Sequence, residues 1–231
     1  MERIKSGVPG LDEIIEGGFI KGHQILLAGN SGTGKTIFGC QFLLEGARRN
    51  EKGLYLTLEE APKSIIENMK RFSWGKNFET YVREKKIIFE RILPTSIDEV
   101  QEKIIKYFNS DKIRRLVLDS LTVAAMGWKE VEEPKLLRRK IFSLIDVLKQ
   151  YEITSLLISE IPHGFQGVSK FGFEEFITDM TIRLEFEPAA LDFHSKLSIL
   201  KARGTNFKKG SFQIIISSNG LEVGKNLLEI I

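Results

Sequence analysis

An eight-residue segment, GNSGTGKT at residues 29–36, constrains the fold of this chain more than any other feature. It follows the apolar run QILLA and precedes a stretch with helical periodicity. The segment matches G-x-x-x-x-G-K-[ST], in which glycines let phosphate oxygens approach backbone N–H groups at the start of a helix. A strand, a glycine-rich loop and a helix in this order predict a phosphate-binding loop in an α/β fold.

The loop supplies the first candidate site residues. Lys35 is expected to reach the β- and γ-phosphates of a nucleotide, and the hydroxyl of Thr36 is expected to ligate Mg²⁺. The complete set of expected nucleotide-binding residues is Gly29, Asn30, Ser31, Gly32, Thr33, Gly34, Lys35 and Thr36.

Carboxylates follow two further apolar runs. Asp119 ends the run LVLD and is the expected second Mg²⁺ ligand, although an acid in this position is also a common helix cap. Glu59 and Glu60 close the run LYLTL, where one of them is expected to orient and deprotonate an attacking water. The alternative is that both only favour the start of a helix at Pro62.

Composition sets broad limits. With 231 residues, 42% of them hydrophobic, the chain is long enough for one large core, and we expect one domain over residues 1–231. A net charge of +3 is too small to demand nucleic acid as a partner and does not exclude it. The single cysteine, Cys40, rules out an intrachain disulfide. No apolar run approaches the ~18 residues of a membrane span, so the expected location is the cytoplasm.

Short apolar runs alternate with amphipathic ones, which is typical of a parallel sheet flanked by helices. Strands are expected at residues 23–28, 54–58, 86–92, 115–120 and 153–159. Helices are expected at residues 34–49 and 62–72, from about residue 96, and at residues 134–151. Three more strands, MTIRLEF, KLSILKARG and SFQIIISS, are expected to be antiparallel at the far edge, before a short C-terminal tail.

Taken together, these motifs resemble the RecA superfamily of P-loop ATPases. Within it, SGVPGLDEIIEGGFIKGHQILLAGNSGTGKT, LEEAPKSIIENMKRFSW and LKARGTNFKKGSFQIIISSNGLEV are similar to the KaiC family, including its archaeal single-domain members. The resemblance covers roughly residues 4–224. It implies a RecA-like core, ATP or ADP with Mg²⁺ as cofactors, and a slow, regulatory ATP hydrolase.

The resemblance also implies a hexameric ring with ATP bound between neighbouring subunits. Glu59 and Glu60 then carry the catalytic-base role. Lys201 and Arg203 match the family's K-x-R element, which reaches the γ-phosphate bound to the adjacent protomer. Without the resemblance, a solvated strand face explains these two cations equally well. The chain has one such domain rather than two and lacks a clear Ser-Thr phosphorylation pair, so a clock function is not supported.

The composition of two predicted loops bears on the choice between the functional alternatives. Residues 124–134 contain three glutamates, whereas residues 162–175 contain three phenylalanines and Lys170. Aromatic residues with a cation are able to stack on single-stranded nucleic acid, but packing against a neighbouring subunit or an ordered lid is the favoured interpretation. The alternatives to a regulatory ring ATPase with an unknown protein partner are a DNA-dependent ATPase of recombination or repair and a nucleotide-binding scaffold.

Overall fold

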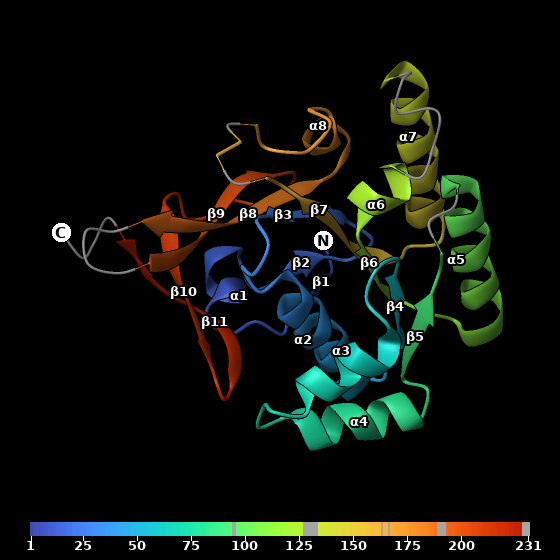
Figure 1. Cartoon of the computed structure of the whole chain (residues 1–231), viewed down its shortest axis with the longest axis horizontal. Coiled ribbons are helices and arrows are strands. Elements are labelled where there is room, and N and C mark those ends of the chain that lie inside the picture. The colour runs from blue at the N-terminus through green and yellow to red at the C-terminus, as the bar shows by residue number, and fades with distance from the viewer. Residues whose placement is uncertain (94–95, 127–133, 163, 166, 189–192, 228–231) are drawn as a thin grey trace.

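A large mixed sheet lies between two layers of helices in the computed structural model (Figure 1). The structure describes residues 1–231 except 94–95, 127–133, 163, 166, 189–192 and 228–231. The strands are β1 Arg3–Ile4, β2 Phe19–Ile20, β3 Gln24–Gly29, β4 Gly53–Thr57, β5 Ile87–Arg91, β6 Arg115–Asp119, β7 Thr154–Glu160, β8 Met180–Pro188, β9 Phe193–Ala202, β10 Ser211–Ser217 and β11 Gly220–Asn226. The helices are α1 Leu11–Ile14, α2 Lys35–Arg48, α3 Pro62–Met69, α4 Gly75–Arg83, α5 Ile97–Asp111, α6 Leu121–Met126, α7 Pro134–Gln150 and α8 Glu174–Ile177.

The strand order within the described residues is β11-β10-β9-β8-β3-β7-β6-β4-β5, and β1 and β2 form a separate pair. Strands β8, β3, β7, β6, β4 and β5 run parallel, whereas β9, β10 and β11 are each antiparallel to their neighbours. Because parallel strands end on the same side, the last residues of β3, β4, β6 and β7 meet along one border of the sheet. We call this border the carboxyl edge and the opposite border the amino edge.

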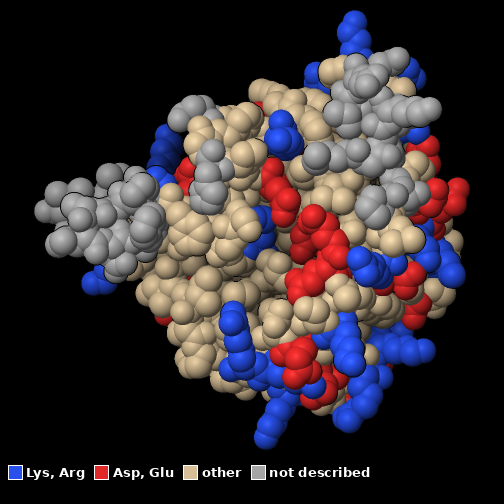
Figure 2. Space-filling view, in the orientation of Figure 1, with Lys and Arg blue, Asp and Glu red and all other residues tan. Residues whose placement is uncertain are grey.

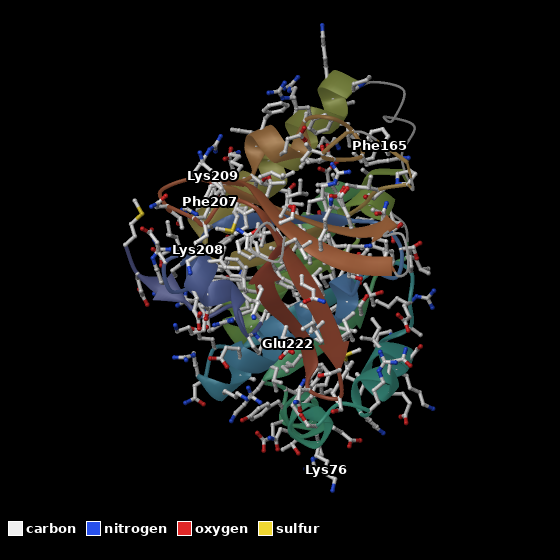
Figure 3. The ribbon with its side chains drawn as sticks, turned by 90° about the vertical axis from the view of Figure 1, so that its left-hand side faces the viewer. Lys76, Phe165, Phe207, Lys208, Lys209 and Glu222 are labelled. Carbon is white, nitrogen blue, oxygen red and sulfur yellow. The ribbon has the colours of Figure 1, made fainter. Side chains whose placement is uncertain are left out.

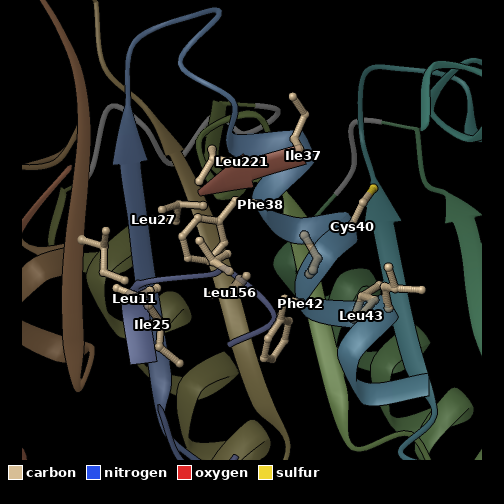
Figure 4. Packing of buried hydrophobic residues seen from close by; sticks show 14 of the residues in the cluster. Leu11, Ile25, Leu27, Ile37, Phe38, Cys40, Phe42, Leu43, Leu156 and Leu221 are labelled. Atoms are coloured by element: carbon tan, nitrogen blue, oxygen red, sulfur yellow. The ribbon is translucent and has the colours of Figure 1, made fainter. Parts of the chain in front are cut away.

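Helix α2 packs on one face of the sheet through a fully apolar seam. Phe38 and Phe42 on α2 have no exposed surface and lie over Leu27 of β3 and Leu156 of β7 (Figure 4). The other face is covered by α5, α6 and α7, whose buried side chains form a second cluster with Leu26, Leu118 and other strand residues. Burying both faces explains why the parallel strands are continuous apolar runs rather than alternating ones.

The predicted mostly parallel α/β sheet with antiparallel C-terminal strands is confirmed. Finer details differ: β8 pairs in parallel with β3, and a fourth strand, β11, replaces the expected C-terminal tail. Strand β11 forms because Leu221 and Val223 alternate into the core after a tight turn at Gly220. The chain also forms α4, which buries Phe78 and packs Tyr81 and Val82 against the same core. No helix among the described residues is long and apolar enough to cross a membrane.

The α2 seam gives a stability prediction. Leu27→Ala removes a fully buried side chain, so we expect the free energy of unfolding to fall by about 2–5 kcal/mol, measured by urea denaturation. Leu93→Ala is the matched control, because Leu93 is 71% exposed and its loss is expected to change stability by less than about 0.5 kcal/mol. Equal effects at the two positions would contradict this view of the core.

Candidate active site

The loop between β3 and α2 is shaped by glycines at positions that other residues tolerate poorly. Gly32 and Gly34 have φ angles of 79° and 92°, which lie in the left-handed region. A Cβ atom on Gly34 would lie only 2.9 Å from Leu221 Cδ1 and 3.0 Å from Ile216 Cδ1, so a side chain there would have to displace both from the hairpin of β10 and β11. The loop is therefore a preformed cradle at the amino-terminal end of α2, where backbone N–H groups and the helix dipole favour an anion.

Lys35 lies at the first position of α2 and is mostly buried. Its Nζ atom donates hydrogen bonds to the carbonyl oxygens of Gly29 and Asn30, at 3.0 and 2.7 Å, so the loop curls around the ammonium group. Burial lowers the pKa of Lys35, and the nearby carboxylates of Glu160 and Asp119 oppose this shift. The lysine is a cation held inside the cradle, which fits a phosphate group as its ligand.

Asp119, the last residue of β6, lies beside the start of α2. Its Oδ2 atom accepts hydrogen bonds from Thr36 Oγ1, at 3.5 Å, and from the hydroxyl of Tyr55 on β4. Burial raises the pKa of the Asp119 carboxyl, whereas the hydrogen bond from Tyr55 and the charge of Lys35 lower it.

A hydroxyl and a carboxylate at this spacing are hard oxygen donors that suit Mg²⁺ when a nucleotide supplies further oxygens. No group of three or more His, Cys, Asp or Glu side chains among the described residues is arranged to hold a metal by itself. The residues present therefore fit a magnesium ion that binds together with a nucleotide.

Glu60 lies where the chain passes from β4 into α3. Its Oε1 atom accepts hydrogen bonds from the side chains of Ser64 and Asn68 on α3, and its backbone carbonyl accepts one from Thr57 Oγ1 at 2.7 Å. The side chain thus faces the pocket and also contacts the first turns of α3. The two sequence interpretations of this glutamate, water activation and support of the helix start, are therefore compatible.

Glu59 is exposed beside Glu60 and does not line the pocket. Partial burial raises the pKa of its carboxyl, and the charges of Glu160 and Asp119 raise it further. The positive charge of Lys35 acts in the opposite direction. The charged groups of the site therefore affect the pKa of Glu59, although this residue does not line the pocket.

These groups surround a pocket of about 350 Å³ at the carboxyl edge. Acidic side chains gather near the middle of this face of the molecule, next to isolated basic ones (Figure 2). The pocket is lined by Ser31, Gly32, Gly34, Lys35, Thr36, Ile37, Glu60, Asn68, Met69, Arg71, Asp119 and Glu160. Sequence reasoning missed Asn68, Arg71 and Glu160. Glu160 could have been predicted from the sequence, because it is a carboxylate at the end of an apolar strand, β7, which pairs directly with β3.

Comparison with known proteins now identifies the family. The family model described as "ATPase: KaiC" matches residues 4–227. The chain belongs to the KaiC family of ATPases. Family membership supports a RecA-like nucleotide-binding core, which the phosphate-binding loop described above also indicates.

Individual KaiC relatives agree with this assignment. The chain is 30% identical over 96% of its length to the circadian clock protein KaiC3 of Synechocystis, and 31% identical over 96% to the circadian clock oscillator protein KaiC of Nostoc. It spans 46% and 44% of those two proteins, less than half of either. It is also 33% identical to a KaiC-like protein of known crystal structure from Pyrococcus horikoshii, with a TM-score of 0.86, covering 97% of this chain and 99% of the other.

The K-x-R residues of this KaiC-family chain do not reach the pocket of their own subunit. Lys201 Nζ donates to the carbonyls of Glu175 and Thr178, and Arg203 donates to the carbonyl of Phe176 at 2.9 Å. Both cations therefore lie against the end of α8. Burial lowers the pKa of Lys201, and the neighbouring charge of Arg203 lowers it further.

A buried carboxylate holds residues 169–173, the last part of the segment between β7 and α8. Glu174 is 1% exposed and accepts hydrogen bonds from Ser169 Oγ and from the backbone N–H groups of Phe171 and Phe173. Phe173 is buried and Phe171 is partly buried, which favours packing over nucleic-acid stacking for these two rings, whereas Phe165 is 39% exposed. Residues 127–133 of the other loop, with its three glutamates, lie outside the described residues.

The cradle predicts which lysine controls nucleotide affinity. Lys35→Ala should weaken ATP binding by about 10- to 100-fold, because hydrogen bonds to charged groups contribute about 1.5–3 kcal/mol each. Fluorescence anisotropy of a labelled ATP analogue measures the change. Lys76→Ala on α4 is the control: this lysine is exposed at the bottom of the view in Figure 3 and does not line the pocket, so its loss should leave the affinity unchanged.

Proposed function

We propose that this protein is a Mg²⁺-dependent ATP hydrolase that works as a ring, with each site completed by the neighbouring copy. The observation that carries the hydrolase proposal is the convergence of Lys35, Thr36, Asp119 and Glu60 at one pocket. These residues come from α2, β6 and the segment between β4 and α3, and a parallel sheet brings them to the same edge. The family supplies ATP as the expected nucleotide.

Each residue has a distinct proposed role. The loop N–H groups and Lys35 bind the phosphates, and Thr36 and Asp119 hold the metal. When bound, Mg²⁺ supplies positive charge that neutralises the phosphate oxygens. Glu60, with Glu59 as the second candidate, orients the attacking water and accepts its proton. The products of this reaction are ADP and inorganic phosphate.

The position of the K-x-R residues supports a shared site. Lys201 pairs with Thr181, and Thr181 pairs with Leu26 near the start of β3. Arg203 lies further still toward the amino edge, where its backbone N–H bonds to Asp179. At ~3.3 Å per residue, Leu26 lies about 10 Å from Gly29 along β3, and Gln24 lies about 16 Å from it. Neither cation reaches the pocket of its own subunit, but a neighbour in a ring would bring its own pair to it.

A regulatory ring ATPase is favoured over two alternatives. A nucleotide-binding scaffold would not need Glu60 at the pocket wall. A DNA-dependent ATPase would need a cationic, aromatic surface, yet Phe171 and Phe173 pack against the core and three acidic side chains line the pocket: Glu60, Asp119 and Glu160. We therefore infer that its working partner is a protein that responds to the nucleotide state of the ring.

Steady-state phosphate release tests the hydrolase assignment. Glu60→Gln should lower the rate at least tenfold and leave ATP affinity unchanged, because only proton acceptance is lost and general-base catalysis contributes about 10²–10⁴-fold. Glu67→Gln, an exposed change on α3, is the control. Wild-type turnover in a Glu59→Gln, Glu60→Gln double variant would exclude these two residues as the base. Strong stimulation by single-stranded DNA would favour the recombination alternative, and no turnover by the wild type would favour the scaffold.

Mixing two inactive variants tests the shared site. One carries Lys35→Ala and the other carries Lys201→Ala with Arg203→Ala, and each alone should be inactive. In a randomly mixed ring, about a quarter of the interfaces join an intact loop to an intact cation pair, so turnover should return to about a quarter of the wild-type rate. Native mass spectrometry with differently tagged chains confirms mixing. Mixed rings without recovered turnover would contradict a site shared between subunits.

A further inference from the structure

Tyr55 contacts the proposed magnesium ligands from inside the sheet. It lies in the middle of β4 and has no exposed surface. Its hydroxyl donates a hydrogen bond to Asp119 Oδ2, the same oxygen that accepts from Thr36 Oγ1. One carboxylate oxygen is thus held by hydroxyl groups from two other elements, β4 and α2.

We infer that Tyr55 is a positioning residue for magnesium. Its hydroxyl holds the Asp119 carboxylate beside the Thr36 hydroxyl, so that both oxygen ligands are in place before the ion binds. Ligating carboxylates commonly depend on such a second layer of hydrogen bonds for their orientation. The inference rests on the proposed role of Asp119 as a magnesium ligand.

The aromatic ring of Tyr55 is itself held on several sides. It stacks on Phe89 of β5, with ring centroids 5.0 Å apart and an interplanar angle of 16°. On the side of α2, a Cβ atom at Gly39 would lie 3.3 Å from the Tyr55 ring and 3.0 Å from Val117 Cγ1. Glycine at position 39 therefore lets the helix approach the ring closely. A ring fixed in this way presents its hydroxyl at one place, which a flexible side chain would not do.

A purely structural role is the competing explanation. A tyrosine inside a core strand needs a partner for its hydroxyl, and a buried carboxylate needs donors, so the pair satisfies both groups without any metal. The two explanations differ in what happens when the hydroxyl alone is removed. Under the positioning role, metal affinity falls, and it falls only through Asp119.

The test measures Mn²⁺ binding to the full chain saturated with ADP, by electron paramagnetic resonance of the free ion. Tyr55→Phe keeps the ring on Phe89 and removes the hydroxyl, and we expect the Mn²⁺ affinity to fall by about 10- to 100-fold. Affinity for ADP in the presence of EDTA should be unchanged. Tyr107→Phe is the matched control, because its hydroxyl donates to Glu90 Oε2, at 3.0 Å, and does not contact Asp119.

A double-mutant cycle with Asp119→Asn completes the experiment. If Tyr55 acts through Asp119, Tyr55→Phe should have no further effect on Mn²⁺ affinity in the Asp119→Asn background. An undiminished effect there would overturn the inference, as would wild-type Mn²⁺ affinity in Tyr55→Phe with only a lower melting temperature. If Asp119→Asn alone leaves Mn²⁺ affinity unchanged, the proposed magnesium site is wrong and the role of Tyr55 fails with it.

Discussion

The parallel pairing of β3 with its neighbours is the constraint on which the site depends. In the sheet register, Gly29 at the end of β3 lies opposite Glu160 at the end of the neighbouring strand β7. Next to β7 come β6 and β4, whose last residues, Asp119 and Thr57, lie opposite each other. Because all four strands run in one direction, residues from four distant parts of the sequence end along one edge. The apolar seam under α2 then fixes the helix whose first turn carries Lys35 and Thr36. The apolar core under α2 and the arrangement of the site residues therefore both follow from the same strand order.

The cradle and the helix that follows it are also hydrogen-bonded to two other parts of the molecule. The Asn30 side-chain amide donates to the carbonyls of Ile161 and Pro162, at the start of the loop that follows β7. On the other side, Gln41 of α2 exchanges hydrogen bonds with the backbone of Leu221 on β11. The loop and the helix that follows it are thus hydrogen-bonded to the segment after β7 and to the C-terminal hairpin, which ties the site to both ends of the sheet's central part.

Local patterns in the sequence predicted where the loop and its neighbouring elements lie, whereas contacts made by pairing across the sheet were missed. The phosphate-binding loop, its flanking strand and helix, and Asp119 at the end of an apolar run are all local signals. Tyr55 was missed because a tyrosine inside an apolar strand is usually a packing residue, and its contact with Asp119 exists only once β4 pairs with β6. The expected strand before the second loop ended at Ser159, one residue too early, so Glu160 was overlooked.

The same contrast applies to the remaining candidates. Helix α4 was missed because its sequence is mostly polar and only Gly75 and Phe78 are buried. Lys201 and Arg203 were identified through family resemblance, and nothing in their spacing shows that they lie far from the pocket of their own chain. That separation follows from the antiparallel pairing of β9 with β8, which places them toward the amino edge. The proposal of a shared site therefore rests on the family resemblance, which identifies the two cations, and on the sheet topology, which places them away from the pocket of their own chain.

A high-resolution structure of the protein with Mg²⁺ and a non-hydrolysable ATP analogue would show directly whether the site is shared between subunits. We expect Lys35 to leave the carbonyls of Gly29 and Asn30 for the phosphates, and Thr36 and Asp119 to flank the metal. We also expect Lys201 and Arg203 of a neighbouring copy to lie within hydrogen-bond distance, about 3 Å, of the terminal phosphate. A terminal phosphate contacted only by its own chain would contradict the shared site, and a nucleotide bound away from the cradle would contradict the whole account.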